Sequence, residues 1–438
     1  MTALTRLVLA AAILPLAVTA APATAQTAAA KPAALKIDKA RIDKILAAMV
    51  AEGRVAGASA LVWQGGKERY FRATGFADRE AARPMARDTL VQIFSMTKPV
   101  TGVALMQLWE QGKFGLDDPL SRYLPEFADA RFYAGKDASG VPLYRPVSRP
   151  TTIRDILRHT GGLSYGGADT PADALFTAAN PLSLDNDLAA MAKAMGPLPL
   201  TYDPGTKWRY SSSVDVQARL VEVLSGEKFT DYVQKHIFDP LGIKDSGWAR
   251  SKDVLPRFAA GYSKGPDGKL VRVPDAQAQA MSFSGKKMTM GGAGIVAPID
   301  DYMRFARMLL GGGSLDGVRI LKPSTVRLMA TDHLDARVTD RSWLTGKGSV
   351  GFGFDFAVRV SPPKDDKENR GAVGEYFWDG AASTLSWIDP ANDLAAVFYV
   401  QKFPFDGTLH HDFREAVYGP GYLGPACLLY TSPSPRDS

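Results

Sequence analysis

The chain has 438 residues, enough for two cores or one large two-lobed domain, and its 46% hydrophobic and 22% charged residues are typical of a globular protein. This composition excludes disorder for the body of the chain. The net charge of +6 comes from 52 basic and 46 acidic side chains with no basic run among aromatics, which disfavours a nucleic-acid partner.

Residues 1–25 have the pattern of a secretory signal peptide. Arg6 precedes the apolar stretch LVLAAAILPLAVTAA, and the small residues ATA at 23–25 predict cleavage before Gln26. The stretch is too short for a membrane span and is interrupted by a proline, and no other segment approaches the length of a span. We therefore expect an exported protein, periplasmic or secreted, without a membrane span.

The elements that follow change character twice along the chain. After an Ala-rich linker, residues 26–36, apolar spacing over 42–50 predicts a helix, and two strand-like segments around Gly65–Lys67 predict a β-hairpin. Residues 95–284 favour helices: TGVALMQLWEQG, TTIRDILRHT, NDLAAMAKAM and SSVDVQARLVEVLSG. From 285 onward a helix, PIDDYMRFARMLLGGG, precedes the strands VGFGFDFAVRV, STLSWIDP and LAAVFYVQKF.

This order predicts an α/β (α+β) protein with a discontinuous sheet domain, residues 37–94 and 285–420. Tight turns between strands imply an antiparallel sheet flanked by helices, with residues 95–284 as a mostly helical inserted domain. The only cysteine, Cys427, excludes an internal disulfide or a cysteine metal site. It lies in a Pro- and Ser-rich segment that we interpret as part of a non-native tail, residues 421–438.

Ser-x-x-Lys occurs four times, and only at Ser95 does it open a strongly apolar helix. There the side chains of Ser95 and Lys98 are within reach of one another, and burial in an apolar wall favours the neutral amine. The helix N-terminus also favours negative charge developing on the serine. The alternative is a helix-capping serine beside a solvated lysine.

Two further segments carry candidate chemistry. Tyr210, in PGTKWRYSSSVDV, stands at the mouth of an amphipathic helix, where a phenol beside a lysine can relay protons, although a tyrosine in a loop is also a common packing residue. Trp378–Ala381 enters a predicted strand, in which Gly380 marks either close backbone approach to a ligand or a simple turn.

Together these three segments resemble the serine β-lactamase and penicillin-binding superfamily, most closely class C β-lactamases and the family VIII carboxylesterases. HTGGLSYG and GGAGIVAPIDDYMRFARMLL add to the likeness, which covers residues 37 to 418. The resemblance implies a β-lactamase-like fold, Ser95 as acylated nucleophile and Lys98 with Tyr210 as the proton-handling pair. It also implies an oxyanion hole from the backbone N–H groups of Ser95 and Ala381.

Two departures from the β-lactamase pattern favour ester hydrolysis. Ser212 replaces the asparagine of Tyr-x-Asn, and Trp378 replaces the lysine of Lys-Thr-Gly, which would meet a substrate carboxylate. An indole suits an uncharged group instead, and Asp379 would weaken anion binding further if it faced the cleft. We expect a small-molecule ester or β-lactam substrate, no metal or organic cofactor, and a pocket lined by Trp378, Gly380, Ser212, Phe94 and Tyr165.

The sequence also allows other interpretations of the site and the function. Residues 162–166, GLSYG, match the nucleophile elbow of α/β-hydrolases at Ser164, but no strand-like run precedes them. The five histidines form no two-histidine helical pair with an acidic partner, which disfavours metal hydrolysis. A β-lactamase, a D-alanyl-D-alanine carboxypeptidase and a non-catalytic penicillin-binding or acyl-sensing protein remain alternatives.

Overall fold

A computed structural model of the chain describes residues 35–283, 285–422 and 424. The predicted signal peptide, nearly all of the linker and most of the predicted tail lie outside these residues. Within the described part, no helix combines the length and apolar character needed to cross a membrane.

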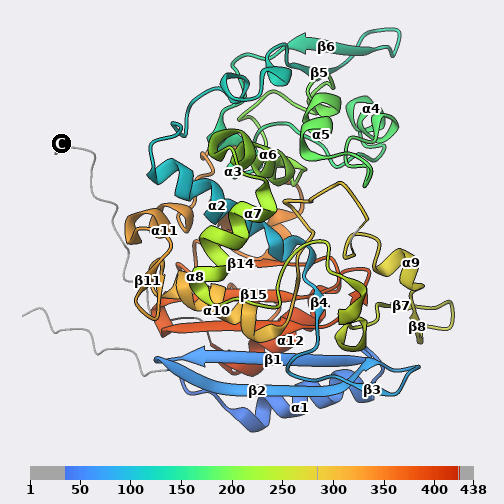
Figure 1. Cartoon of the computed structure of the whole chain (residues 1–438), viewed down its shortest axis with the longest axis vertical. Coiled ribbons are helices and arrows are strands. Elements are labelled where there is room, and N and C mark those ends of the chain that lie inside the picture. The colour runs from blue at the N-terminus through green and yellow to red at the C-terminus, as the bar shows by residue number, and fades with distance from the viewer. Residues whose placement is uncertain (1–34, 284, 423, 425–438) are drawn as a thin grey trace, which may run out of the picture. The chain divides into compact units, whose positions relative to one another are not determined.

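An antiparallel sheet of eight strands forms the centre of the fold (Figure 1), as the tight turns predicted. Both ends of the chain build it, because Ser59 of β1 lies opposite Tyr399 of β16. In spatial order the strands are β12 (Val350–Phe352), β13 (Ala357–Arg359), β14 (Tyr376–Asp379), β15 (Leu385–Asp389), β16 (Leu394–Tyr399), β1 (Gly57–Gln64), β2 (Lys67–Asp78) and β3 (Arg83–Pro84).

Local turn chemistry closes two of the hairpins. Gly65 and Gly66 join β1 to β2 with φ of 59° and 75°, the positive values that two-residue hairpin loops require. Between β15 and β16 the chain passes through a short 3₁₀ turn, η7 (Pro390–Asn392), and Asp393 then adopts φ 47°. Both hairpins agree with the sequence prediction.

The sheet is covered on both faces at its centre, which explains why β16 is apolar and buried along its whole length. Along β1, Ala60 and Val62 pack toward α1 and α12, whereas Leu61 points to the opposite face and packs with α10. Most of the helices between residues 98 and 241 gather on the α10 side (Figure 1).

Twelve α-helices lie in the described residues, and the longer ones follow the predicted apolar spacing. They are α1 (Lys39–Ala51), α2 (Lys98–Glu110), α3 (Ile153–Leu157), α4 (Pro171–Ala179), α5 (Leu188–Met195), α6 (Ser213–Ser225), α7 (Phe229–Val233), α8 (Asp239–Leu241), α9 (Asp275–Ala278), α10 (Ile299–Leu310), α11 (Pro323–Met329) and α12 (Gly407–Tyr418). Helix α2 is buried on nearly all sides and packs against α6, so it forms the core of the helical part.

Short strands and turns connect these elements. The small sheets pair β4 (Val91–Gln92) with β9 (Val296–Ala297), β5 (Arg131–Lys136) with β6 (Pro142–Pro146), and β10 (Ser314–Leu315) with β11 (Val318–Arg319); a fourth contains β17 (Lys402–Phe403), β7 (Tyr262–Lys264) and β8 (Leu270–Arg272). The remaining helical turns are η1 (Phe94–Thr97), η2 (Leu120–Arg122), η3 (Pro125–Phe127), η4 (Gln234–Phe238), η5 (Lys252–Arg257) and η6 (Ser342–Lys347).

The segment VGFGFDFAVRV is a hairpin of β12 and β13, where a continuous strand was the simpler expectation. The chain reverses at residues 353–356, where Asp355 adopts φ 62°. Its carboxylate is fully buried and accepts a hydrogen bond from Gln217 Nε2 at 3.1 Å. A hydrogen bond from α6 therefore stabilises this turn, which the apolar sequence of the segment does not predict.

Candidate active site

Ser95 lies where the chain turns sharply from β4 into η1 and α2. The preceding residue, Phe94, has φ 46°, a left-handed conformation that non-glycine residues rarely adopt and that is often retained at functional sites. Ser95 is half-buried, whereas Met96 and Thr97 are buried. The turn therefore leaves the Ser95 hydroxyl accessible at the entrance of the buried helix α2.

Lys98 is the first residue of α2, and its side chain is almost completely buried. Its Nζ donates to Ser95 Oγ at 3.2 Å and to Gly292 O at 2.7 Å. Burial lowers the pKa of Lys98 to about 8, while nearby carboxylates limit the decrease. A substantial fraction of the amine is thus neutral near pH 8 and available to accept a proton.

Tyr210 reaches the same place from the segment before α6. Its ring centroid lies 4.6 Å from Lys98 Nζ, and its hydroxyl interacts with the side chain of Ser95. Burial raises the pKa of Tyr210 well above its usual value, and the hydrogen bond with Ser95 opposes this only in part. The phenol is therefore neutral at pH 7 and suited to passing protons between groups.

The end of β14 packs against the segment that leads to Ser95. A Cβ at Gly380 would lie 2.4 Å from Ile93 O, so only glycine permits this backbone approach. The next residue, Ala381, is exposed. The structure thus places Gly380 and Ala381 beside the segment that leads to Ser95, where the resemblance predicts an oxyanion donor.

Three of the expected pocket residues surround these groups. The indole of Trp378 donates from Nε1 to Tyr210 OH at 3.4 Å and is itself buried. The ring of Tyr165 lies 5.6 Å from that of Tyr210. Phe94 packs edge-to-face on Phe403, with 5.5 Å between ring centroids. Trp378 is thus positioned to orient Tyr210, and Tyr165 and Phe94 frame the site.

The two other serines that we considered lie inside the protein. Ser212 is fully buried, and its hydroxyl donates to Ser164 O at 2.7 Å, so it is satisfied by the protein itself. Ser164 is also buried and bonds Asp173 through its hydroxyl. Helix α3 and a loop precede Ser164, so the strand-turn-helix arrangement of a nucleophile elbow is not formed there.

Two buried carboxyl groups lie behind Lys98 that sequence reasoning missed. Asp215 Oδ1 accepts from Gly292 N at 3.0 Å, and Gly292 O accepts from Lys98, so one residue's backbone links the two side chains. The Asp215 Oδ2, Lys98 Nζ and Tyr165 OH atoms all lie within 3.2 Å of the position a Cβ at Gly292 would take. Burial raises the pKa of both Asp215 and Asp355, and the Lys98 charge opposes this.

A second lysine near the site was also missed. Lys347, the last residue of η6, forms an ion pair with Asp379 and lies 5.1 Å from the ring centroid of Trp378. Trp343, on the same turn, stacks beside Trp378. Ser95 and Lys98 can be paired from their spacing of three residues. Lys347 and Asp379 cannot be paired in this way, because they lie more than 30 residues apart in the chain.

His159, the histidine nearest Tyr210, lies inside the protein. His159 is buried among Trp208, Tyr210 and Phe352, and burial lowers its pKa well below the usual value. Among residues 35–283, 285–422 and 424, no group of three His, Cys, Asp or Glu side chains could hold a metal ion.

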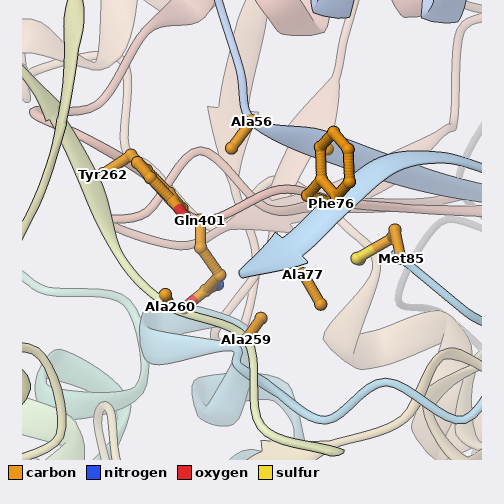
Figure 2. A pocket seen from close by; sticks show the side chains of 9 residues that line it. Ala56, Phe76, Ala77, Met85, Ala259, Ala260, Tyr262 and Gln401 are labelled. Atoms are coloured by element: carbon orange, nitrogen blue, oxygen red, sulfur yellow. The ribbon is translucent and has the colours of Figure 1, made fainter. Parts of the chain in front are cut away.

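A small pocket elsewhere in the molecule lacks comparable chemistry. Figure 2 shows it between the start of β1, the end of β2 and the segment before β7, lined by Ala56, Gly57, Phe76, Ala77, Met85, Ala259, Ala260, Tyr262 and Gln401. The hydroxyl of Tyr262 donates to Glu80 at 2.6 Å, and the Gln401 amide donates to Gln92 O. Its polar groups are therefore engaged within the protein.

Comparisons with known proteins identify the family of the chain. The family model described as Beta-lactamase matches residues 42–418. The Mycobacterium tuberculosis protein Rv1367c is 35% identical over 84% of this chain and 90% of its own length. Esterase EstB of Burkholderia gladioli is 30% identical over 84% of this chain and 92% of its own length.

A solved structure matches over nearly its whole length. EstCE1, described as a hydrolase with promiscuous acyltransferase activity, superposes with a TM-score of 0.73 at 26% identity, covering 87% of this chain and 98% of EstCE1. The predicted β-lactamase-like fold is confirmed. The chain belongs to the β-lactamase family and is a serine hydrolase of that fold.

Proposed function

We propose that the protein is an exported hydrolase that cleaves carboxylic esters of small acyl groups through an acyl-enzyme on Ser95. The observation that carries this proposal is the 3.2 Å separation of Lys98 Nζ and Ser95 Oγ, with Tyr210 bonded to the same serine. A half-buried hydroxyl beside a buried amine and a phenol is the arrangement of an activated nucleophile. The name of the relative EstB, an esterase, supports the reaction class.

In this mechanism Ser95 attacks the ester carbonyl and loses its proton to the Lys98 and Tyr210 pair. The backbone N–H groups of Ser95 and Ala381 receive the oxyanion. The pair then delivers the proton to the departing alcohol, so the first product leaves neutral. In the second step Tyr210 takes a proton from a water while passing its own proton to Lys98. The water attacks the acyl-enzyme, and the proton returns through Tyr210 to Ser95 Oγ as the acid leaves.

The residue identities around Tyr210 and Trp378 support esters over β-lactams. Trp378 places an uncharged indole where the β-lactamase pattern has a lysine, and the nearby Lys347 is already paired with Asp379. Acyl transfer to an alcohol uses the same acyl-enzyme with a different acceptor in the second step. The description of EstCE1 supports testing it as a second activity.

Labelling with a fluorophosphonate, followed by peptide mass mapping, tests the nucleophile. We expect an adduct on Ser95 in the parent protein. The Ser95→Ala variant should lose both labelling and ester turnover, whereas the matched control Ser164→Ala should retain labelling and turnover. An adduct on Ser164, or full turnover by Ser95→Ala, would overturn the proposal.

A second assay separates turnover from stoichiometric binding. Purified protein is mixed with a chromogenic short-chain ester, with and without a primary alcohol, and separately with a chromogenic cephalosporin. We expect ester product in large excess over enzyme and little cephalosporin cleavage. Product equal to enzyme would identify an acyl-binding protein instead.

Export is proposed from the composition of residues 1–25. N-terminal sequencing of the protein produced with its leader should begin at Gln26. An uncleaved N-terminus in a cytoplasmic fraction would contradict this part of the proposal.

A further inference from the structure

The ammonium group of Lys347 is enclosed by aromatic rings at the edge of the candidate site. Its Nζ lies 5.1 Å from the ring centroids of Trp343 and Trp378 and 5.0 Å from that of Phe405. Aromatic faces attract a cation at such distances. The lysine is therefore held in a defined place, with its side chain only 11% exposed.

Asp379 supplies the opposing charge. It is the last residue of β14, it is ion-paired with Lys347, and its own side chain is 11% exposed. On its other side, His410 Nδ1 lies 3.9 Å from Asp379 Oδ2, and burial lowers the pKa of His410 to about 4, so this imidazole is neutral at pH 7. The local charge at pH 7 is thus one lysine balanced by one aspartate.

The pair adjoins the groups that we propose react with substrate. Asp379 directly precedes Gly380 and Ala381, and its charge raises the pKa of both Lys98 and Tyr210. Trp343 lies with its ring centroid 5.4 Å from that of Tyr210 and remains 46% exposed, so the aromatic wall around Lys347 continues to solvent. A substrate group at this wall would feel the charge of either member.

We propose that the Lys347–Asp379 ion pair sets the charge selectivity of the ester site, so that it accepts uncharged esters and keeps Lys347 from binding a substrate carboxylate. This inference rests on the proposed function of Ser95. An unpaired lysine here would attract an anionic substrate group, and an unpaired aspartate would repel it. Paired, their fields largely cancel, and the site discriminates by shape and apolar contact.

Reciprocal variants test the proposal. Asp379→Asn, Lys347→Gln and the double variant are assayed with two matched ester pairs: p-nitrophenyl hexanoate against the mono-p-nitrophenyl ester of adipic acid, and 4-ethylphenyl acetate against 4-acetoxybenzoate. The first pair places the carboxylate on the acyl side and the second on the alcohol side. The readout is the ratio of kcat/KM for the anionic ester to that for the neutral ester, which is independent of how much enzyme is folded.

In at least one pair, we expect Asp379→Asn to raise this ratio about tenfold, Lys347→Gln to lower it about tenfold, and the double variant to return within about threefold of the original. Lys235→Gln, which removes an exposed lysine paired with Glu227, controls for net charge and should leave the ratio unchanged.

Opposite shifts of threefold or more in the two single variants support the inference, and any other pattern in both pairs overturns it. The same assays in a Ser95→Ala background measure turnover that does not depend on Ser95. Persistent turnover there would refute the proposed function itself, which separates that failure from a failure of the charge-selectivity inference.

Discussion

At the scale of single residues, the state of Lys98 is set by groups that neighbour it only in space. Spacing predicts that its amine lies near Ser95, and the structure brings the two atoms to 3.2 Å. Burial favours the neutral amine, whereas the carboxylates of Asp215 and Asp355 favour the ammonium form. Asp215 is linked to Lys98 through the backbone of Gly292, and its charge makes the largest of these contributions that raise the pKa of Lys98.

Asp215→Asn should therefore lower the pKa of Lys98. If neutral Lys98 is the base, kcat/KM rises with pH through that pKa, and removing the negative charge moves the rising limb to lower pH. We expect a displacement of about half a pH unit or more, measured from the pH profile of ester hydrolysis.

Asp301→Asn is the matched control, because Asp301 is a largely buried carboxyl whose pKa is raised by burial but which does not contribute to the pKa shift of Lys98. In Asp301→Asn, the rising limb of kcat/KM should stay at the same pH as in the parent protein. A lower rate in Asp215→Asn without any displacement would assign Asp215 a purely structural role.

The residues that sequence reasoning missed are missed for a physical reason. Ser95 and Lys98 are visible because they belong to one helical turn, and Tyr210 because it opens an amphipathic helix. Lys347 and Asp355 have no periodic context, since each lies in a short turn whose position depends on distant segments. Only the folded arrangement shows that they lie near Trp378 and Lys98.

At the scale of elements, the site depends on how closely β14 approaches η1. Gly380 provides this contact, because a Cβ there would lie 2.3 Å from Thr384 Oγ1 and 2.4 Å from Ile93 O. The second obstacle is backbone and cannot rotate away. The geometry between Ser95 and Ala381 therefore relies on one glycine.

Gly380→Ala should separate β14 from η1 and misalign the proposed oxyanion donor. We expect kcat/KM for ester hydrolysis to fall about a hundredfold or more, the scale of losing one such donor, together with a loss of about 1–3 kcal/mol in the free energy of unfolding. Gly407→Ala, where the added Cβ meets only Phe405 at an ordinary 3.5 Å, should keep activity within about twofold. Equal activities of the two variants would contradict this account.

Helix α12 is attached to the sheet by a buried charged contact. Arg414, 1% exposed, donates to Glu375 Oε1 at 2.7 Å and to Arg370 O at 3.0 Å. Its guanidinium also lies over the rings of Phe377 and Trp387. Loss of Arg414 would leave the buried Glu375 carboxylate with a longer contact of 3.4 Å to Arg359 and the hydroxyl of Tyr418, so its charge would be less well compensated.

Arg414→Ala should accordingly lower the free energy of unfolding by about 3–5 kcal/mol, measured by urea denaturation. Arg54→Ala removes a partly exposed pair between Asp412 of α12 and the segment after α1, and it should cost less than about 1 kcal/mol. Similar losses in both variants would show that burial of the ion pair is not decisive.

An element can be predicted from the sequence when residues close to it in the chain determine it, and it escapes prediction when distant residues do. The β1–β2 hairpin is predicted from Gly65 and Gly66, which adopt φ of 59° and 75°. The β12–β13 turn escapes prediction because Asp355 is stabilised by Gln217 across the molecule. Local signals therefore identify elements, whereas long-range contacts decide their boundaries.

At the scale of the whole molecule, the chain closes its central sheet with its two ends. Strand β1 pairs with β16 on one side and β2 on the other, and α1 and α12 cover the same face. Antiparallel pairing is predictable from the tight turns, but the β1–β16 contact joins residues 340 apart, Ser59 and Tyr399. No local pattern specifies such a pairing, and it forms only after a long loop has closed.

Global stability should also depend on pH through a buried histidine on α12. His410 is 3% exposed, its Nε2 donates to Ser383 O at 2.9 Å, and burial lowers its pKa to about 4 despite the favourable charge of Asp379; Lys347 and Arg414 lower it further. In the unfolded chain its pKa is near 6.5. Below pH 6.5 the unfolded chain therefore binds a proton that the folded protein excludes.

This difference removes about 3 kcal/mol of stability from the protein as the pH falls from 7 to 4. His410→Gln keeps an N–H donor for Ser383 O but cannot be protonated, so its free energy of unfolding should decline less over this interval, by about that amount. His236→Gln, at a half-buried histidine beside Glu227, should follow the parent curve more closely. Urea denaturation at half-unit pH steps measures the three curves, and a His410→Gln curve parallel to the parent would show that His410 is not the group responsible.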